Sequence, residues 1–245
     1  MQNDGVLVFA GYDPSAGAGV LQDVHILRMG GIYAFGIITA MVYENTCRVK
    51  KVYPMDIDAQ IDLAKEEDIK FRIFKLGLVY SKEQLNSILR FTFKIKPEKI
   101  VVDPIFQASS KSLLTHLTPE DYIDFLRQTD SILMPNMDEF KMLFKDKPFE
   151  DAAIQNKTDI ILKSFKVSSS EVLDLLIEKN GHITPFRHKK LKTSDIHGTG
   201  CTIASLLSLH LLTYKDIKKA YMYAIRDFEK LIKHTINAGC QRIII

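Results

Sequence analysis

The chain has 245 residues, of which 46% are hydrophobic and 26% charged, so it is long enough and apolar enough to bury a large core. Its formal net charge of +3 comes with scattered lysines and no basic stretch interleaved with aromatics, which argues against nucleic acid as a partner. No run of about 18 apolar residues occurs, and the N-terminus lacks the basic region of a signal peptide, so we expect a cytoplasmic protein without a membrane span. The three cysteines, Cys47, Cys201 and Cys240, are odd in number and far apart, which argues against a disulfide framework or a structural zinc site and favours a reducing compartment.

Apolar runs typical of buried strands alternate with helical patterns along the chain. Strands are expected at residues 6–10, 33–42, 73–79, 99–106, 131–134 and 159–163. Helices are expected to start near Val20, Ile57, Ser81, Thr118, Thr199 and Asp216. The Asn180-Gly181 dipeptide between two apolar runs predicts a two-residue hairpin.

This alternation predicts an α/β fold with three layers: a mainly parallel central sheet, helices on both faces and an antiparallel edge hairpin. The sequence contains no repeat, low-complexity tract or convincing linker, so we expect a single domain over residues 1–245. In such sheets the ligand lies beyond the carboxyl ends of the strands. The segments that directly follow the apolar strands are therefore the candidate site.

The first of these segments is GYDPSAGAG, residues 11–19. It lacks the Gly-Lys-Ser/Thr ending of a P-loop, and its glycines are wrongly spaced for a dinucleotide fingerprint. One interpretation is a strand-to-helix turn that needs small residues. The other is a loop whose backbone closes on a ligand, with Asp23 one turn into the following helix.

The segment HGTGCT carries a stronger signal. Gly198 and Gly200 let backbone N–H groups converge at the start of a helix, whose positive end favours an anion. Cys201 is either a small buried hydrophobe or a thiol whose thiolate is favoured by the helix N-terminus. A thiolate beside bound phosphate could accept a proton from an alcohol.

Two carboxylates and one lysine complete the constellation. Asp103 and Glu139 follow apolar strands, and a pair of carboxylates near an anion site suggests Mg²⁺ bound together with substrate phosphates. The alternatives are a turn-forming Asp-Pro for Asp103 and a helix cap for Glu139. Lys163 ends the strand DIILK, where it either meets a nucleotide phosphate or is simply solvated. His197 and Cys201 could suggest a metal pair, but no other ligand has suitable spacing. Together, anion site, carboxylates and lysine indicate phosphoryl transfer, which depends on positioning and charge neutralisation.

Several segments, taken together, resemble one family. AGYDPSAGAGVLQD, ITAMVYENT, KLGLV, VVDPI, LMPNMDE, ILK and HGTGCT occur in the order found in the hydroxymethylpyrimidine and phosphomethylpyrimidine kinases of thiamin synthesis, which are ribokinase-like enzymes. The resemblance runs from about Leu7 to Leu212, and the DPSAGAG loop and HGTGC are its most specific parts. It implies ATP- and Mg²⁺-dependent phosphorylation of 4-amino-5-hydroxymethyl-2-methylpyrimidine and then of its monophosphate. The family often dimerises, so a homodimer is expected.

The resemblance also implies a role for each candidate residue. The pyrimidine pocket would be lined by Gly11, Asp13, Gly19, Asp23 and Glu44. Mg²⁺ and its water shell would be held by Asp103, Asn136 and Glu139. Lys163 would touch the ATP phosphates, with Asn136, Gly198 and Gly200 also on the nucleotide. Gly198, Thr199 and Gly200 would form the anion hole, and Cys201 would take the proton of the substrate hydroxyl.

The sequence departs from the family pattern at three places. Glu44 stands where the family usually has Gln, and an ionised Glu can accept hydrogen bonds but not donate them. Ser164-Phe165 replace two glycines after the lysine, and we expect Phe165 to reshape or narrow the nucleotide side. The family's Gly-rich C-terminal segment is absent. These departures motivate two alternatives: a pyridoxal (vitamin B6) kinase, and a catalytically weak pyrimidine-binding relative.

Overall fold

The computed structural model of the chain describes residues 4–108, 112–191 and 195–245. Its centre is a nine-stranded sheet of order β3-β2-β1-β4-β5-β6-β7-β8-β9. The strands are β1 (Asp4–Tyr12), β2 (Tyr33–Asn45), β3 (Arg48–Pro54), β4 (Lys70–Leu76), β5 (Lys99–Val102), β6 (Ser131–Leu133), β7 (Asp159–Val167), β8 (Glu171–Ile177) and β9 (Ile183–Lys189). The six strands from β2 to β7 in this order pair in parallel, and antiparallel strands close both edges.

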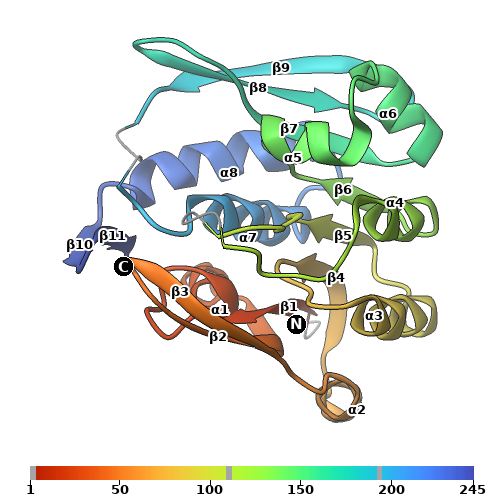
Figure 1. Ribbon diagram of the computed structural model, residues 1–245. Coiled ribbons are helices and arrows are strands. Elements are labelled where there is room, and N and C mark those ends of the chain that lie inside the picture. The colour runs from red at the N-terminus through yellow and green to blue at the C-terminus, as the bar shows by residue number, and fades with distance from the viewer. Residues whose placement is uncertain (1–3, 109–111, 192–194) are drawn as a thin grey trace.

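Helices cover both faces of this sheet (Figure 1). They are α1 (Gly19–Met29), α2 (Asp58–Glu66), α3 (Lys82–Ile95), α4 (Pro119–Arg127), α5 (Met137–Phe144), α6 (Phe149–Asn156), α7 (Thr199–Leu211) and α8 (Ile217–Leu231). One apolar core lies under α2 to α6, and the other lies under α1, α7 and α8. Strand β1 shows why its sequence is a continuous apolar run: Leu7 and Phe9 enter the first core, while Val6 and Val8 enter the second.

The predicted three-layer fold is confirmed, including an antiparallel hairpin around Asn180-Gly181, but the predicted two-residue turn is wrong because the last strand pair is Ile177 with Ile183. There β8 and β9 pair antiparallel, and Gly181 has a φ of +88°. The predicted helix starts at Ser81 and Thr118 are real N-caps, each accepting a backbone N–H three residues on. Among the described residues, no helix is both long enough and apolar enough to cross a membrane.

Three parts of the fold were not predicted. Strand β3 has no buried residue, so it lacks the apolar signature of a strand. Helices α5 and α6 have only eight residues each, too short for a clear periodic pattern. After α8 the chain forms a small second sheet, the antiparallel hairpin of β10 (Thr235–Ala238) and β11 (Gln241–Ile244).

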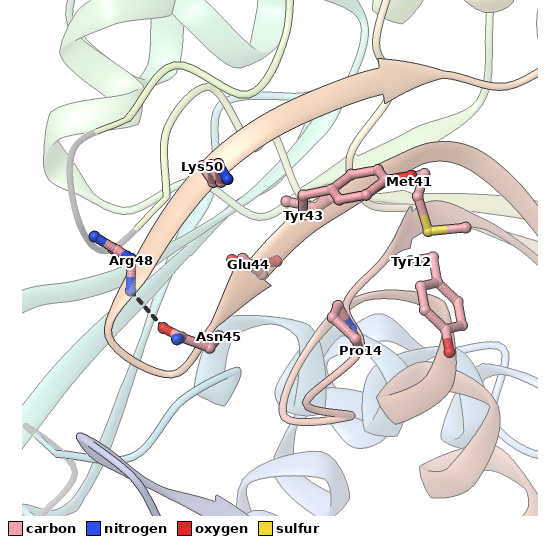
Figure 2. A pocket seen from close by; sticks show the side chains of 9 residues that line it. Tyr12, Pro14, Met41, Tyr43, Glu44, Asn45, Arg48 and Lys50 are labelled. Atoms are coloured by element: carbon pink, nitrogen blue, oxygen red, sulfur yellow. Dashed lines mark hydrogen bonds between the residues drawn. The ribbon is translucent and has the colours of Figure 1, made fainter.

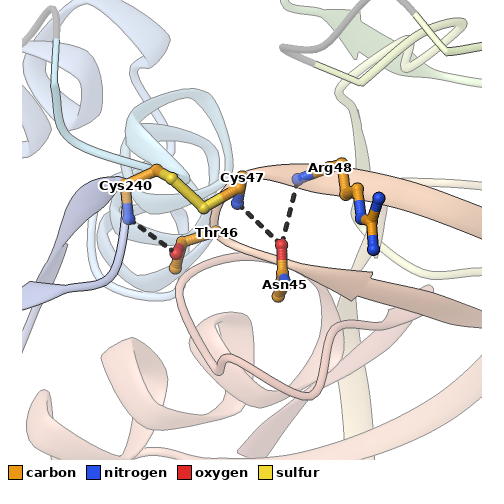
Figure 3. The surroundings of a disulfide bond; sticks show 5 residues. All are labelled: Asn45, Thr46, Cys47, Arg48 and Cys240. Carbon is orange, nitrogen blue, oxygen red and sulfur yellow. Dashed lines mark hydrogen bonds between the residues drawn. A yellow bond between two sulfur atoms is a disulfide. The ribbon is translucent and has the colours of Figure 1, made fainter.

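The expectation of no disulfide is wrong. Cys47, in the turn between β2 and β3, is bonded to Cys240, in the turn between β10 and β11 (Figure 3). The two Cα atoms are 5.1 Å apart although 193 positions separate the residues. A hydrogen bond from the Cys240 amide to Thr46 Oγ1, 3.1 Å long, joins the same two turns. Only the fold brings the turns together, so cysteine spacing could not reveal the pair.

Candidate active site

A cavity of about 650 Å³ opens at the carboxyl ends of the parallel strands, where the topology predicts a ligand site. Its lining runs from Gly11 and Glu44, through a central group around Cys201, to Val172 and Phe228 at the far end. The segments that sequence reasoning singled out therefore meet in one place. Of the predicted site residues, all but Asp23 lie in its wall: Gly11, Asp13, Gly19, Glu44, Asp103, Asn136, Glu139, Lys163, Gly198, Thr199, Gly200 and Cys201.

The N-terminus of α7 forms one side of the centre. Gly198 has a φ of +74°, and a Cβ built on it would lie 1.8 Å from the Gly17 carbonyl oxygen, so only glycine fits there. A Cβ on Gly200 would lie 3.6 Å from both Asp103 Oδ2 and Lys163 Nζ. The first turn of this 13-residue helix therefore lies beside a charged pair in the cavity wall. Free N–H groups and the helix dipole make this end suitable for an anion.

Asp103 and Lys163 form that pair, with Lys163 Nζ donating to Asp103 Oδ1 over 2.7 Å. Their side chains are 4% and 14% exposed. Burial by itself would raise the pKa of Asp103, but Lys163 and Lys75 outweigh it, so the pKa of this carboxyl lies below its ordinary value. Burial likewise would lower the pKa of Lys163, but Asp103 and Glu139 raise it above its ordinary value. Both groups are therefore charged at neutral pH.

Glu139 is both a helix cap and a wall of the cavity. Its Oε2 accepts the Asn136 N–H at 2.8 Å, and Asn136 Oδ1 accepts the Glu139 N–H at 2.9 Å. Burial raises the pKa of Glu139 to about 7, with a further contribution from Asp103 that opposes the lowering by Lys163. The alternative interpretation of Glu139 as a cap is thus correct, and it is compatible with a role in the cavity.

The two carboxylates fit a magnesium ion that takes its remaining ligands from phosphate and water. Mg²⁺ is usually bound by one or two carboxylates plus substrate phosphates, rather than by a cage of protein ligands. Within the described part of the chain, no group of three or more His, Cys, Asp or Glu side chains could hold a metal alone. The negative charges of Asp103 and Glu139 repel each other, so each carboxyl makes ionisation of the other less favourable. A cation bound between them would offset this repulsion.

Cys201 is the third residue of α7, within its first turn, and is 6% exposed. The sequence suggested that the helix N-terminus favours its thiolate, but this expectation is wrong for the free protein. Burial raises the pKa of Cys201 to about 12, and the carboxylates Asp23 and Asp103 add to this rise against the lowering by Lys75. Desolvation is the largest of these effects, and the sulfur carries its proton.

Asp23 was expected in the substrate pocket, but it lies behind the cavity wall. It is completely buried, and its carboxylate accepts from Lys75 Nζ at 2.6 Å and from Ser205 Oγ at 2.8 Å. Lys75 is itself completely buried and was missed by sequence reasoning. The available signal was a single lysine inside the apolar strand FRIFKL. Within this pair, the buried positive charge of Lys75 lowers the pKa of both Cys201 and Asp103.

The first loop closes the other end of the cavity. Asp13, 2% exposed, accepts hydrogen bonds from the Ser15 and Ala18 amides at 2.8 and 3.0 Å. His197 Nε2 lies 3.0 Å from Asp13 Oδ2, which joins the first loop to the HGTGC segment. His197 has this structural partner, which spacing along the chain could not show. Gly19, with a φ of +63°, would place a Cβ 2.3 Å from the Gly11 carbonyl oxygen, so the loop needs glycine there.

Glu44 stands at the rim of this end. It lines the main cavity and also a neighbouring hollow of about 420 Å³ on the β2–β3 hairpin, together with Tyr12, Pro14 and Met41 (Figure 2). Burial raises the pKa of Glu44 to about 7, and the nearby Asp13 adds to the rise while His197 opposes it. A carboxyl with this pKa is partly protonated at neutral pH, so it can donate as well as accept a hydrogen bond.

Phe165 does not narrow the nucleotide side. Its ring packs edge-on against Phe149, with centroids 5.5 Å apart, and belongs to the core under α2 to α6. Ser164 faces the cavity instead. The expectation failed because the β7–β8 register shifts between Leu162 and Lys166, which changes the face on which each side chain falls.

Fold and site together define a phosphotransferase: an α/β sheet whose strand ends carry a helix N-terminus, a buried Asp–Lys pair and a second carboxylate. Comparison with known proteins then gives the family. The chain belongs to the phosphomethylpyrimidine kinase family, whose model matches residues 13–244.

Individual relatives agree with this family. The hydroxymethylpyrimidine/phosphomethylpyrimidine kinase of Aquifex aeolicus is 27% identical over 95% of the chain and 96% of that protein. Among solved structures, a phosphomethylpyrimidine kinase from Clostridium difficile 630 has a TM-score of 0.76 at 25% identity, covering 94% of the chain and 99% of its own. A pyridoxal kinase from Staphylococcus aureus, solved with AMP-PCP, has a TM-score of 0.83 at 23% identity, covering 98% and 92%, and shares the fold.

Proposed function

We propose that the protein transfers the γ-phosphoryl group of ATP to the hydroxymethyl group of 4-amino-5-hydroxymethyl-2-methylpyrimidine, and then to the resulting monophosphate. The observation that carries this proposal is the meeting of the α7 N-terminus with the Asp103–Lys163 pair in the middle of one elongated cavity. Such a site places an anion between fixed positive groups, which is what phosphoryl transfer needs. The names of the relatives supply the substrate.

The two ends of the cavity suit the two substrates. The first loop, Glu44 and the Asp13–His197 pair form a small polar end that suits an aminopyrimidine. The opposite end combines Val172, Leu191 and Phe228 with basic side chains, which suits a nucleotide. The N–H groups of Gly198, Thr199 and Gly200 lie between the ends and would hold the moving phosphoryl group.

Asp103 and Glu139 would hold Mg²⁺, with Asn136 fixing Glu139 through their reciprocal hydrogen bonds. The ion would neutralise charge on the nucleotide phosphates. Lys163 would move from its bond with Asp103 toward a phosphate oxygen as Asp103 turns to the metal. Among the described residues, Lys163 Nζ forms its hydrogen bond and ion pair with the Asp103 carboxylate.

Cys201 would take the proton of the substrate hydroxyl late in the transfer. Since the free thiol holds its own proton, that proton would first pass to bulk water, which leaves Sγ free to accept the proton of the substrate hydroxyl. Lys75 beneath the sulfur would stabilise the resulting anion. The hydroxyl proton then passes to Sγ as the bond from oxygen to phosphorus forms.

A pyridoxal kinase is the second candidate. The Glu44 substitution favours it, because this carboxyl meets whichever ring occupies the polar end. Phosphorylation of hydroxymethylpyrimidine and of pyridoxal, measured side by side with ATP and Mg²⁺, separates the candidates. We expect the larger kcat/KM for the pyrimidine; a larger value for pyridoxal would reject the proposed substrate. Light scattering on the same preparation tests the expected homodimer.

A further inference from the structure

A buried carboxylate that sequence reasoning did not single out lies behind Lys163. Asp174, on β8, is 3% exposed. It accepts the Ser164 N–H at 2.6 Å and the Tyr221 hydroxyl at 2.7 Å, and its Oδ2 lies 2.9 Å from His188 Nε2. The three partners come from β7, α8 and β9. Asp174 is thus held from three directions at the end of the cavity opposite the first loop, and the cavity wall includes all four residues.

The backbone after Lys163 needs such a partner. Ser164 has a φ of +53°, in the left-handed region that non-glycine residues rarely adopt. It lies where the β7–β8 pairing is interrupted between Leu162 and Lys166, so the bulge takes its amide out of the ladder. The carboxylate of Asp174 receives that amide in a short, charge-assisted hydrogen bond, which stabilises an otherwise unfavourable backbone conformation.

This backbone turn sets the direction of the Lys163 side chain. The Lys163 amide donates to the Pro135 carbonyl at 2.9 Å, and the next amide donates to Asp174. Between these two anchors the side chain reaches 2.7 Å from Asp103. We propose that Asp174, fixed by His188 and Tyr221, is a positioning residue that clamps the Ser164 backbone and so aims Lys163 at the nucleotide phosphates. This inference rests on the proposed function in taking ATP as the nucleotide.

The substitution Asp174→Asn tests the clamp, because an amide keeps the shape but loses the charge. A misdirected Lys163 should raise the KM for ATP by about 10-fold or more and lower kcat, while the KM for the pyrimidine changes less than about 2-fold. Asp159→Asn is the matched control. Asp159 is another buried aspartate, 4% exposed, that accepts an amide at the opposite end of β7. A purely structural role for Asp174 would make the two variants behave alike.

Two further variants keep the test decisive. Tyr221→Phe removes one donor without altering volume, and we expect a rise in the KM for ATP of about 3-fold even if Asp174→Asn does not fold. Ser164→Gly in the Asp174→Asn background should recover part of the loss, because glycine adopts the left-handed conformation freely. Equal increases in the KM for both substrates, or no recovery by glycine, would overturn the clamp.

Direct ADP binding by calorimetry separates this inference from the proposed function. If the wild-type chain binds ADP but phosphorylates no pyrimidine, the proposed function fails, and weaker ADP binding by Asp174→Asn than by Asp159→Asn still supports the clamp. If both variants bind ADP like the wild type, the clamp is refuted whatever the turnover shows.

Discussion

Replacing Glu44 by Gln should stabilise the ligand-free protein at alkaline pH and leave its stability unchanged in acid. Folding raises the pKa of Glu44 from 4.5 to about 7, so the folded state holds this proton more tightly than the unfolded state. The contribution of protonated Glu44 to the stability of the fold is therefore fully present below pH 4.5, and it is lost as the pH rises through 7. A shift of this size corresponds to at most about 3 kcal/mol. Because the carboxyl is partly exposed, solvent screening reduces the expected loss to about 1–2 kcal/mol.

The assay is urea unfolding of the wild type and Glu44→Gln at pH 5 and pH 9. Between pH 5 and pH 9, the free energy of unfolding of Glu44→Gln should rise by about 1–2 kcal/mol relative to that of the wild type. Glu171→Gln, at an exposed position of β8, controls for loss of one negative charge. A difference between wild type and Glu44→Gln that does not change with pH would refute the reasoning.

Three other predictions concern single residues. Cys47→Ser removes the disulfide to Cys240, 193 positions away, so the free energy of unfolding should fall by up to about 5 kcal/mol and the Tm by about 10 °C or more. A reductant should lower the Tm of the wild type and leave the Tm of the variant unchanged. Lys75→Met leaves Asp23 buried and unpaired, so urea unfolding should show a loss of about 3–5 kcal/mol, and a loss below 1 kcal/mol would contradict the buried pair. Cys201→Ala should remove most turnover while ADP binding measured by calorimetry persists; unchanged turnover would reject its role as base.

The centre of the fold could be predicted because its strands are buried on both faces. Residues 6–10 of strand β1 are all apolar for this reason, and the carboxyl end of the strand directed attention to the first loop. The edges gave weaker signals. Strand β3 faces solvent, and the β10–β11 hairpin has four residues per strand, so neither has a pattern that distinguishes it from a loop.

The residues of the site also fall into those that could be predicted from the sequence and those that could not. Gly198, Asp103 and Lys163 were predictable because local rules place glycines at a helix start and charged residues at strand ends. The pairs Lys75–Asp23 and Asp13–His197 were not, because 52 and 184 positions separate their members. Cys201 shows a third limit: the sequence reveals the helix dipole, but the desolvation that raises its pKa depends on the packed structure.

The most direct test of the central claim is phosphorus NMR of the wild-type protein with ATP, Mg²⁺ and 4-amino-5-hydroxymethyl-2-methylpyrimidine. We expect the ATP signals to give way to those of ADP and a pyrimidine monophosphate ester, and then to those of the pyrimidine diphosphate. ATP that stays intact, or that releases only inorganic phosphate, would contradict phosphoryl transfer to the pyrimidine hydroxyl.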